Sequence, residues 1–215
     1  MTELTQNEVR DLILSERIIA ILRHVPGADV ENILEALRQG GIRVAEVTLN
    51  TKGALEILQQ MTKVTGTRML LGAGTVTTAA EVEEAVKAGA RFIVTPIMVP
   101  EVIEKCLDLG VVAVPGAMTP TEIATAQRLG AHLVKVFPAS TLGANYFKEL
   151  QGPMGHIPLI ATGGISLSNG RSFLQAGAKG LGVGSSLVSP QLVSEGRWED
   201  LRRVAQDYKE MVNSL

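Results

Sequence analysis

Short apolar runs recur along the chain at regular intervals, and segments with helical periodicity lie between them. The runs have the length of strands that are buried on both faces, as the strands of a parallel sheet are. The eight runs cover residues 18–22, 44–49, 69–71, 92–94, 111–114, 133–137, 159–161 and 181–183. Strands that alternate with helices indicate an α/β fold, and eight such units predict a single-domain (β/α)8 TIM barrel over residues 1–215.

The intervening segments have the apolar faces of amphipathic helices. Residues 30–37 and 82–88 each place their apolar side chains on one helical face. Several such segments are followed directly by a glycine, which takes the left-handed conformation of a helix cap without steric cost. Outside the eight units, the pattern predicts an extra N-terminal helix over 4–14, closing the barrel bottom, and a last helix over 198–212.

Composition narrows the class of protein. The 215 residues are 3% aromatic and carry a net charge of -2, so we expect no nucleic acid partner. The chain has no uninterrupted apolar stretch that could span a membrane, and its acidic N-terminus does not resemble a signal peptide, so we expect no membrane partner. Cys106 is the only cysteine, which favours a reducing compartment, and the predicted location is cytoplasmic.

The histidines argue against metal chemistry. His24, His132 and His156 are far apart in the sequence and form no paired-ligand motif. Each is expected at the surface or at a strand end. The sequence therefore predicts no metal site and no cofactor.

A lysine lies inside the apolar run at 133–137. Lysine is almost never buried without a reason, and burial disfavours the ammonium and lowers its pKa. The neutral amine that results is what Schiff-base chemistry with a carbonyl substrate requires. Lys135 is therefore a candidate nucleophile. The alternative is that it lies at a strand end and extends its ammonium into water.

Glu46 is the second charged residue inside an apolar run. A buried carboxylate needs a partner or a task. The second and sixth strands lie on opposite sides of an eight-stranded barrel, so Glu46 and Lys135 can converge on its lumen. One interpretation is a structural ion pair between them. The other is a general acid or base that faces an amine nucleophile, and the two are not exclusive.

The last two strands end in small residues that are typical of a phosphate site. Gly163 and Gly164 follow the seventh strand, and Gly184, Ser185 and Ser186 follow the eighth. These residues offer backbone N–H groups without bulky side chains. The loops after strands 7 and 8 are the recurrent phosphate site of this barrel, and helix N-termini add positive potential there.

Two further strand ends supply weaker candidates. Arg23 follows the first strand, and its guanidinium can bind a substrate carboxylate with two parallel hydrogen bonds. Its alternative is a solvated charge at a strand end. Thr75 follows the third strand, where it could cap the next helix or bond a substrate oxygen.

These residues together resemble the 2-keto-3-deoxy-6-phosphogluconate (KDPG) and 4-hydroxy-2-oxoglutarate (KHG) aldolases, which are class I lyases of the Entner–Doudoroff route. The resemblance covers roughly residues 18–187 and rests on segments in a fixed order. They are Ile-Ala-Ile-Leu-Arg at 19–23, Glu-Val-Thr-Leu at 46–49, Gly-Ala-Gly-Thr-Val at 72–76, Phe-Ile-Val-Thr-Pro at 92–96, Lys-Val-Phe-Pro-Ala at 135–139 and Thr-Gly-Gly-Ile at 162–165.

The resemblance implies a role for each candidate residue. Lys135 forms the Schiff base, and Glu46 transfers protons. Substrate-binding positions are implied at Arg23, Asn50, Thr75, Pro96, Phe137 and Thr162, and phosphate-binding positions at Gly163, Gly164, Gly184, Ser185 and Ser186. The implied protein is a metal-free homotrimer whose partner is a small 2-oxo acid or its phosphate.

The chain departs from the family pattern at one position. Several members read Glu-Val-Thr-Leu-Arg-Thr at the second strand, with the arginine taken to bind the substrate carboxylate, whereas this chain has Asn50. Asparagine donates hydrogen bonds but carries no charge. Arg23 is expected to take that role. The departure leaves three substrates open: the gluconate-derived acid phosphate, its galactonate-derived counterpart, and 4-hydroxy-2-oxoglutarate.

Two other functions fit the same barrel. A sugar-phosphate isomerase or epimerase would use Glu46 as a base and Lys135 as an electrostatic partner, without a covalent adduct. A non-catalytic sugar-phosphate-binding barrel would use the same glycines but leave both ionisable residues without a task. The fold alone does not separate these functions.

Overall fold

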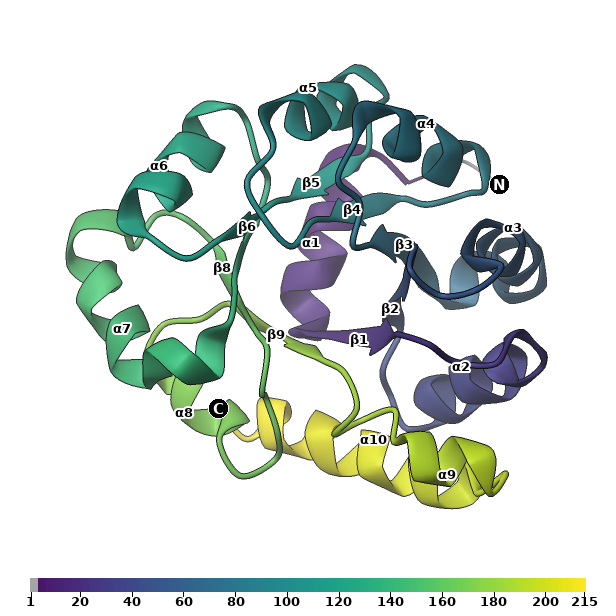
Figure 1. Cartoon of the computed structure of the whole chain (residues 1–215). Coiled ribbons are helices and arrows are strands. Elements are labelled where there is room, and N and C mark those ends of the chain that lie inside the picture. The colour runs from purple at the N-terminus through teal and green to yellow at the C-terminus, as the bar shows by residue number, and fades with distance from the viewer. Residues whose placement is uncertain (1–3) are drawn as a thin grey trace.

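The computed structural model describes residues 4–215 and shows a barrel of parallel strands inside a ring of helices (Figure 1). The strand order is β5-β4-β3-β2-β1-β9-β8-β7-β6, and every pairing is parallel. The strands are β1 (Ile18–Leu22), β2 (Val44–Thr48), β3 (Leu70–Gly74), β4 (Phe92–Val94), β5 (Val112–Val114), β6 (Gly116–Ala117), β7 (Val134–Val136), β8 (Leu159–Thr162) and β9 (Gly180–Val183). The predicted (β/α)8 barrel is confirmed.

The fifth barrel strand is interrupted, which the apolar pattern did not predict. Pro115 separates β5 from β6; β5 pairs with β4, whereas β6 pairs with β7. Proline has no N–H to give to a strand ladder, but its carbonyl accepts a hydrogen bond from the Lys135 N–H at 2.9 Å. The two short strands therefore occupy one place in the barrel, and together they close it.

Helices cover the outside of the barrel and one of its ends. They are α1 (Gln6–Glu16), η1 (Gly27–Asp29), α2 (Val30–Gln39), α3 (Ala54–Thr65), η2 (Gly66–Arg68), α4 (Ala79–Lys87), α5 (Pro100–Asp108), α6 (Pro120–Arg128), α7 (Ala139–Met154), α8 (Gly170–Gln175), α9 (Pro190–Ser194) and α10 (Trp198–Asn213). The extra N-terminal helix and the long last helix are both present. None of the helices within residues 4–215 is long and apolar enough to cross a membrane.

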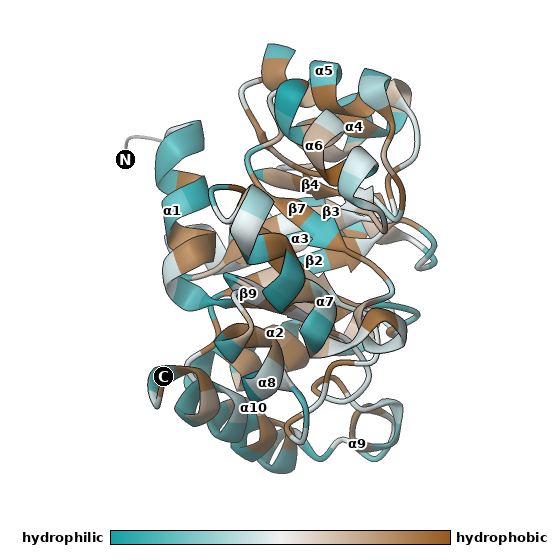
Figure 2. Cartoon of the chain, turned by 90° about the vertical axis from the view of Figure 1, so that its left-hand side faces the viewer, coloured by the Kyte–Doolittle hydropathy of each residue, from teal (hydrophilic) through white to brown (hydrophobic). Residues whose placement is uncertain are grey.

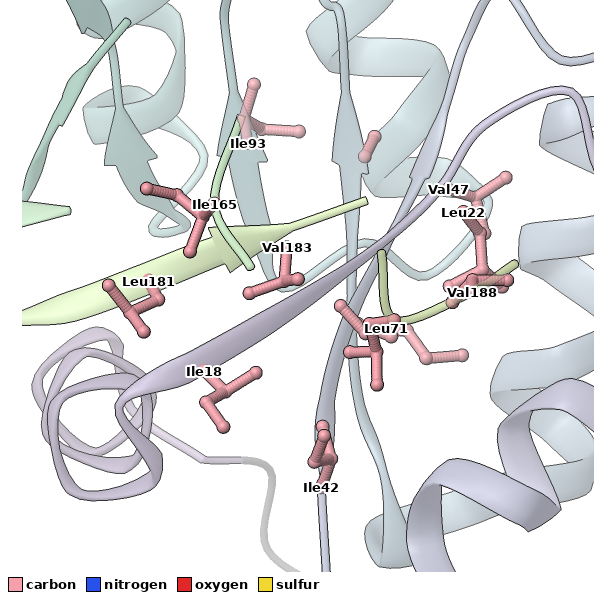
Figure 3. Packing of buried hydrophobic residues seen from close by; sticks show 14 of the residues in the cluster. Ile18, Leu22, Ile42, Val47, Leu71, Ile93, Ile165, Leu181, Val183 and Val188 are labelled. Carbon is pink, nitrogen blue, oxygen red and sulfur yellow. The ribbon is translucent and has the colours of Figure 1, made fainter. Parts of the chain in front are cut away.

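Apolar side chains form two layers because successive residues of a strand point to opposite sides. The outer layer packs between the strands and the helices, and Figure 3 shows Ile18, Leu22 and Leu71 among its members. The exposed faces of the helices are the more polar ones (Figure 2). The helices therefore bury the outward-facing side of the barrel wall.

The inner layer fills the lumen and continues into α1. Val9 and Ile13 of this helix belong to the same buried cluster as the inward-facing Ile19, Leu70 and Ile160. In Figure 1 the helix lies behind the strands, and in Figure 2 it lies at one end of the barrel. It covers the amino-terminal ends of the strands, through contacts with β1, β5 and β9.

A buried carboxylate fixes α1 to the wall of the barrel. Glu16, the last residue of α1, is only 5% exposed. It accepts hydrogen bonds from Arg43 Nη2 at 2.5 Å and from Lys209 Nζ at 2.8 Å. Arg43 lies just before β2 and Lys209 belongs to α10, so one carboxylate joins α1 to two parts of the chain that are far from it in the sequence.

Candidate active site

A cavity of about 590 Å³ opens at the carboxyl ends of β1, β7, β8 and β9. This is the end of a (β/α)8 barrel where functional groups gather. Nine of the residues predicted from the sequence line it: Arg23, Lys135, Phe137, Thr162, Gly163, Gly164, Gly184, Ser185 and Ser186. Glu46 lies in a much smaller adjoining void of about 10 Å³, which Lys135 also lines. The structure thus brings both charged residues of the apolar strands to one place.

Lys135 lies at the meeting point of the cavity and the void. It is only 3% exposed, and its register places it between Gly116 of β6 and Ile160 of β8. Burial lowers the pKa of its amine; Arg23 lowers it further, and Glu46 opposes the shift. Its Nζ lies 5.0 Å from the centre of the Phe137 ring. The ammonium is therefore poorly solvated, and the amine lies in the lining of the cavity.

Glu46 is buried without a hydrogen-bond partner for one of its oxygens. The residue is 1% exposed, and its Oε1 is the one buried side-chain polar atom without a partner in the described chain. Burial raises the pKa of its carboxyl, while Lys135 and Arg23 act in the opposite direction. The described residues form no Glu46–Lys135 ion pair within 4.0 Å. A carboxyl that is held unpaired next to an amine is suited to proton transfer.

Gly74 leaves the space that Glu46 occupies. A Cβ atom on Gly74 would lie 2.4 Å from Oε1 and 2.7 Å from Cδ of Glu46, and both distances are shorter than van der Waals contact. The Gly74→Ala variant should therefore displace the carboxyl and lower kcat/KM by roughly 10- to 100-fold, since small misplacements of a catalytic group have effects of that size.

The matched control for this variant is Gly152→Ala, because an added Cβ at Gly152 meets no atom within 4 Å. Steady-state kinetics and a thermal melt of both variants separate catalysis from folding. Wild-type kcat/KM in Gly74→Ala would contradict the position of Glu46.

The predicted phosphate loops present unpaired backbone donors; we call Gly163, Gly164, Gly184, Ser185 and Ser186 the glycine-serine loops. None of their backbone N–H groups donates to a protein oxygen within residues 4–215. Gly163 and Gly164 have φ values of 95° and 69°, which glycine adopts without strain. Successive free N–H groups of this kind form a site for an anion.

A comparison with known protein families assigns the chain to one of them. Residues 9–204 match the family model described as KDPG and KHG aldolase. The chain belongs to this aldolase family. It is therefore a lyase, and membership favours carbon–carbon cleavage over the isomerase and the non-catalytic alternatives.

Individual relatives of this aldolase are similar along most of its length. A probable 2-dehydro-3-deoxy-6-phosphogalactonate aldolase of Rhizobium meliloti is 35% identical and covers 80% of this chain and 82% of its own. A 2-dehydro-3-deoxy-phosphogluconate aldolase of Treponema pallidum is 34% identical, with coverages of 93% and 95%. The KDPG aldolase of Legionella pneumophila is 26% identical, has a TM-score of 0.86, and covers 92% of this chain and 96% of its own. Its structure holds pyruvate captured at low pH as a covalent carbinolamine intermediate.

Three predicted residues of the aldolase lie away from the lining of the large cavity. They are Asn50, Thr75 and Pro96. Thr75 does not cap the next helix, because Thr78 forms the capping box of α4 with Glu81. Pro96 packs against Gly116, where an added Cβ would come within 2.4 Å of the Pro96 carbonyl. Contact of these three residues with substrate remains a prediction.

One residue that supports the cavity wall, without lining the cavity itself, was not predicted from the sequence. The Tyr208 hydroxyl donates to Ser186 Oγ at 3.1 Å, and Ser186 Oγ donates to the Ile165 carbonyl at 2.5 Å. Tyr208 belongs to α10, so it joins the last helix to the glycine-serine loops. The only local signal was a buried, hydrogen-bonding aromatic residue on an amphipathic helix, which does not reveal its partner.

Proposed function

We propose that this aldolase cleaves a 4-hydroxy-2-oxo acid phosphate through a Schiff base on Lys135. The observation that carries the proposal is a buried amine of lowered pKa at the foot of an open cavity, next to a buried carboxyl with a free oxygen. The principal substrate is 2-dehydro-3-deoxy-6-phosphogluconate, cleaved to pyruvate and glyceraldehyde 3-phosphate. The relatives and the free N–H groups of the glycine-serine loops support a phosphorylated substrate.

The first half of the reaction builds an electron sink. The neutral Lys135 amine attacks the C2 ketone to give a carbinolamine, and loss of water gives a protonated imine. Burial favours this step, because it lowers the pKa of the amine and so raises the fraction that is unprotonated at a given pH. Glu46 can deliver the proton that the departing hydroxyl needs, since burial raises the pKa of its carboxyl.

The second half breaks the bond between C3 and C4. Glu46, acting through a water molecule, accepts the C4 hydroxyl proton, and the electron pair of the C3–C4 bond moves into the imine. The aldehyde leaves, and an enamine of pyruvate stays on Lys135. Protonation at C3 and hydrolysis of the imine release pyruvate and restore the amine.

The substrate is held at its two charged ends in this proposal. Arg23 binds the carboxylate in place of the arginine that Asn50 replaces, and the glycine-serine loops bind the phosphate. Phe137 and Thr162 line the same cavity and can contact the part of the substrate between these ends. Relatives named for the gluconate- and galactonate-derived acids are both similar to this chain, so the configuration at C4 decides between two close substrates.

A coupled assay tests the function and the choice of substrate. The purified chain is given the gluconate-derived acid phosphate, its galactonate-derived epimer or 4-hydroxy-2-oxoglutarate, with a chelator present. Pyruvate formation is followed with lactate dehydrogenase. We expect the highest kcat/KM with the gluconate-derived acid phosphate. Absence of pyruvate from all three substrates would overturn the proposed function.

Arg23 should also set the pH range of the reaction. Its charge lowers the pKa of Lys135, so Arg23→Gln should raise that pKa and leave less neutral amine at a given pH. The acidic limb of the kcat/KM profile is then expected to move to higher pH. KM should rise about tenfold, as for a lost charge-assisted hydrogen bond. Arg23→Lys retains the charge and should show a smaller displacement; an unmoved acidic limb in Arg23→Gln would contradict this electrostatic role.

Assembly and location complete the proposal. We expect a homotrimer of single-domain barrels in the cytoplasm, acting in sugar-acid breakdown of the Entner–Doudoroff type, as the family resemblance implies. Light scattering after size exclusion measures the mass directly, and a monomer at working concentration would contradict the trimer.

A further inference from the structure

His24 lines the mouth of the cavity, although its sequence context predicted only a surface or strand-end histidine. It follows Arg23 directly after β1 and shares the cavity lining with Lys135 and Ser185. Its side chain is exposed, and its imidazole nitrogens bond no protein atom within residues 4–215. A donor at this position is therefore available to a ligand in the cavity.

Strand order places His24 beside the glycine-serine loops. β1 pairs in parallel with β9, and Ala20 lies opposite Val183. Because parallel strands end at the same edge, the residues that follow β1 run alongside residues 184–186, which follow β9. His24 therefore lies on the side of the cavity where backbone N–H groups are free.

The backbone of His24 is held in a conformation that is energetically unfavourable for any residue with a Cβ atom. Its φ is 55°, which glycine adopts freely and other residues rarely adopt. The Thr51 hydroxyl accepts the His24 N–H at 2.9 Å, and Thr51 Oγ1 lies 3.1 Å from Thr48 Oγ1. Both threonines are buried. A pair of buried hydroxyls thus fixes a strained residue at the cavity mouth, and strain of this kind concentrates at ligand sites.

We propose that the His24 imidazole donates a hydrogen bond to the terminal phosphate of the substrate, beside the free N–H groups of the glycine-serine loops. Neutral and protonated imidazole both carry an N–H donor, so the contact forms in either state. In this arrangement Thr51 is a positioning residue that acts through the His24 backbone. The inference rests on the proposed function, because it assigns one more contact to the same phosphate.

A matched pair of substrates tests the assignment. They are 2-dehydro-3-deoxy-6-phosphogluconate and its dephosphorylated counterpart, and the readout is the ratio of their kcat/KM values. His24→Gly removes the donor and suits the left-handed backbone, so the variant is expected to fold. The ratio should fall about tenfold, as for the loss of a hydrogen bond to a charged group. His24→Asn keeps a shorter donor and should give an intermediate ratio, and His156→Gln, at an exposed histidine outside the cavity lining, should give the wild-type ratio.

Thr51 supplies an independent test of the positioning. Thr51→Val removes the acceptor for the His24 N–H at nearly constant volume and should lower the same ratio, while Thr51→Ser restores the hydroxyl and should restore the ratio. A purely structural role would lower both kcat/KM values together and leave the ratio unmoved.

Direct titration with inorganic phosphate provides a readout that does not depend on turnover. We expect a dissociation constant about tenfold higher for His24→Gly than for the wild type. If wild-type protein cleaves the substrates while the ratio and the phosphate constant of His24→Gly stay within twofold of wild type, the role of His24 is wrong and the proposed function stands. If wild-type protein cleaves neither substrate, the proposed function fails.

Discussion

Replacing Lys135 by methionine is expected to abolish aldol cleavage, with kcat reduced by about 10⁴-fold or more, as for removal of a covalent catalyst. Methionine fills a similar volume and has no amine, so neither the carbinolamine nor the imine can form. The same change should leave the melting temperature at or above the wild-type value, because burial of this amine opposes its charged form and lowers its pKa.

The combination of lost activity and retained stability distinguishes a catalytic amine from a structural one. Lys179→Met is the matched control, because Lys179 is exposed and lies just before β9, outside the cavity lining. Coupled kinetics and thermal melts are measured on both variants. Turnover by Lys135→Met within 100-fold of wild type would remove this residue from the mechanism.

Replacing Glu46 by glutamine should slow turnover by about 10²–10⁴-fold, the usual contribution of a positioned acid or base. Glutamine has the same shape but does not exchange the proton of the C4 hydroxyl. Some imine should still form, because Lys135 keeps its buried environment. The loss should therefore appear in kcat more than in KM.

The same variant gives a pH dependence with a definite sign. The Glu46 charge raises the pKa of Lys135. Its removal should lower that pKa further, and the acidic limb of the kcat/KM profile should move to lower pH. Glu31→Gln, on the exposed face of α2, controls for a change in net charge. Full activity in Glu46→Gln would exclude proton transfer by this residue.

The fold and the candidate status of two buried charged residues were predictable, because both depend on the local pattern of apolar and polar residues. Eight apolar runs set the strands, and Glu46 and Lys135 stood out because a charge in such a run is costly. Their convergence followed from the position of the second and sixth strands on opposite sides of a barrel. The unpaired state of Glu46 did not follow, because it depends on side-chain placement that Gly74 permits.

Features that join distant parts of the chain could not be predicted. The contact of Glu16 with Lys209 and that of Ser186 with Tyr208 each join α10 to residues far from it in the sequence. Periodicity describes which face of a helix is buried, but not which polar group it meets there. The break at Pro115 was visible as a proline, yet only the pairing of β5 and β6 with different neighbours shows that the barrel tolerates it.

His24 shows the same limit at the site itself. One histidine at a strand end has no distinguishing pattern, and the sequence indicates neither its left-handed backbone nor the hydroxyl of Thr51 that holds it. The sequence therefore supplied the chemistry of the lumen, while the groups at the cavity mouth required the three-dimensional arrangement of loops.

Trapping with borohydride tests the central claim most directly. The folded wild-type protein is incubated with pyruvate and a chelator, reduced, digested and analysed by peptide mass spectrometry. We predict a reduced pyruvyl adduct on Lys135, present in Glu46→Gln and absent in Lys135→Met. An adduct on another lysine, or no adduct on folded protein that still releases pyruvate from its substrate, would contradict Schiff-base catalysis by Lys135.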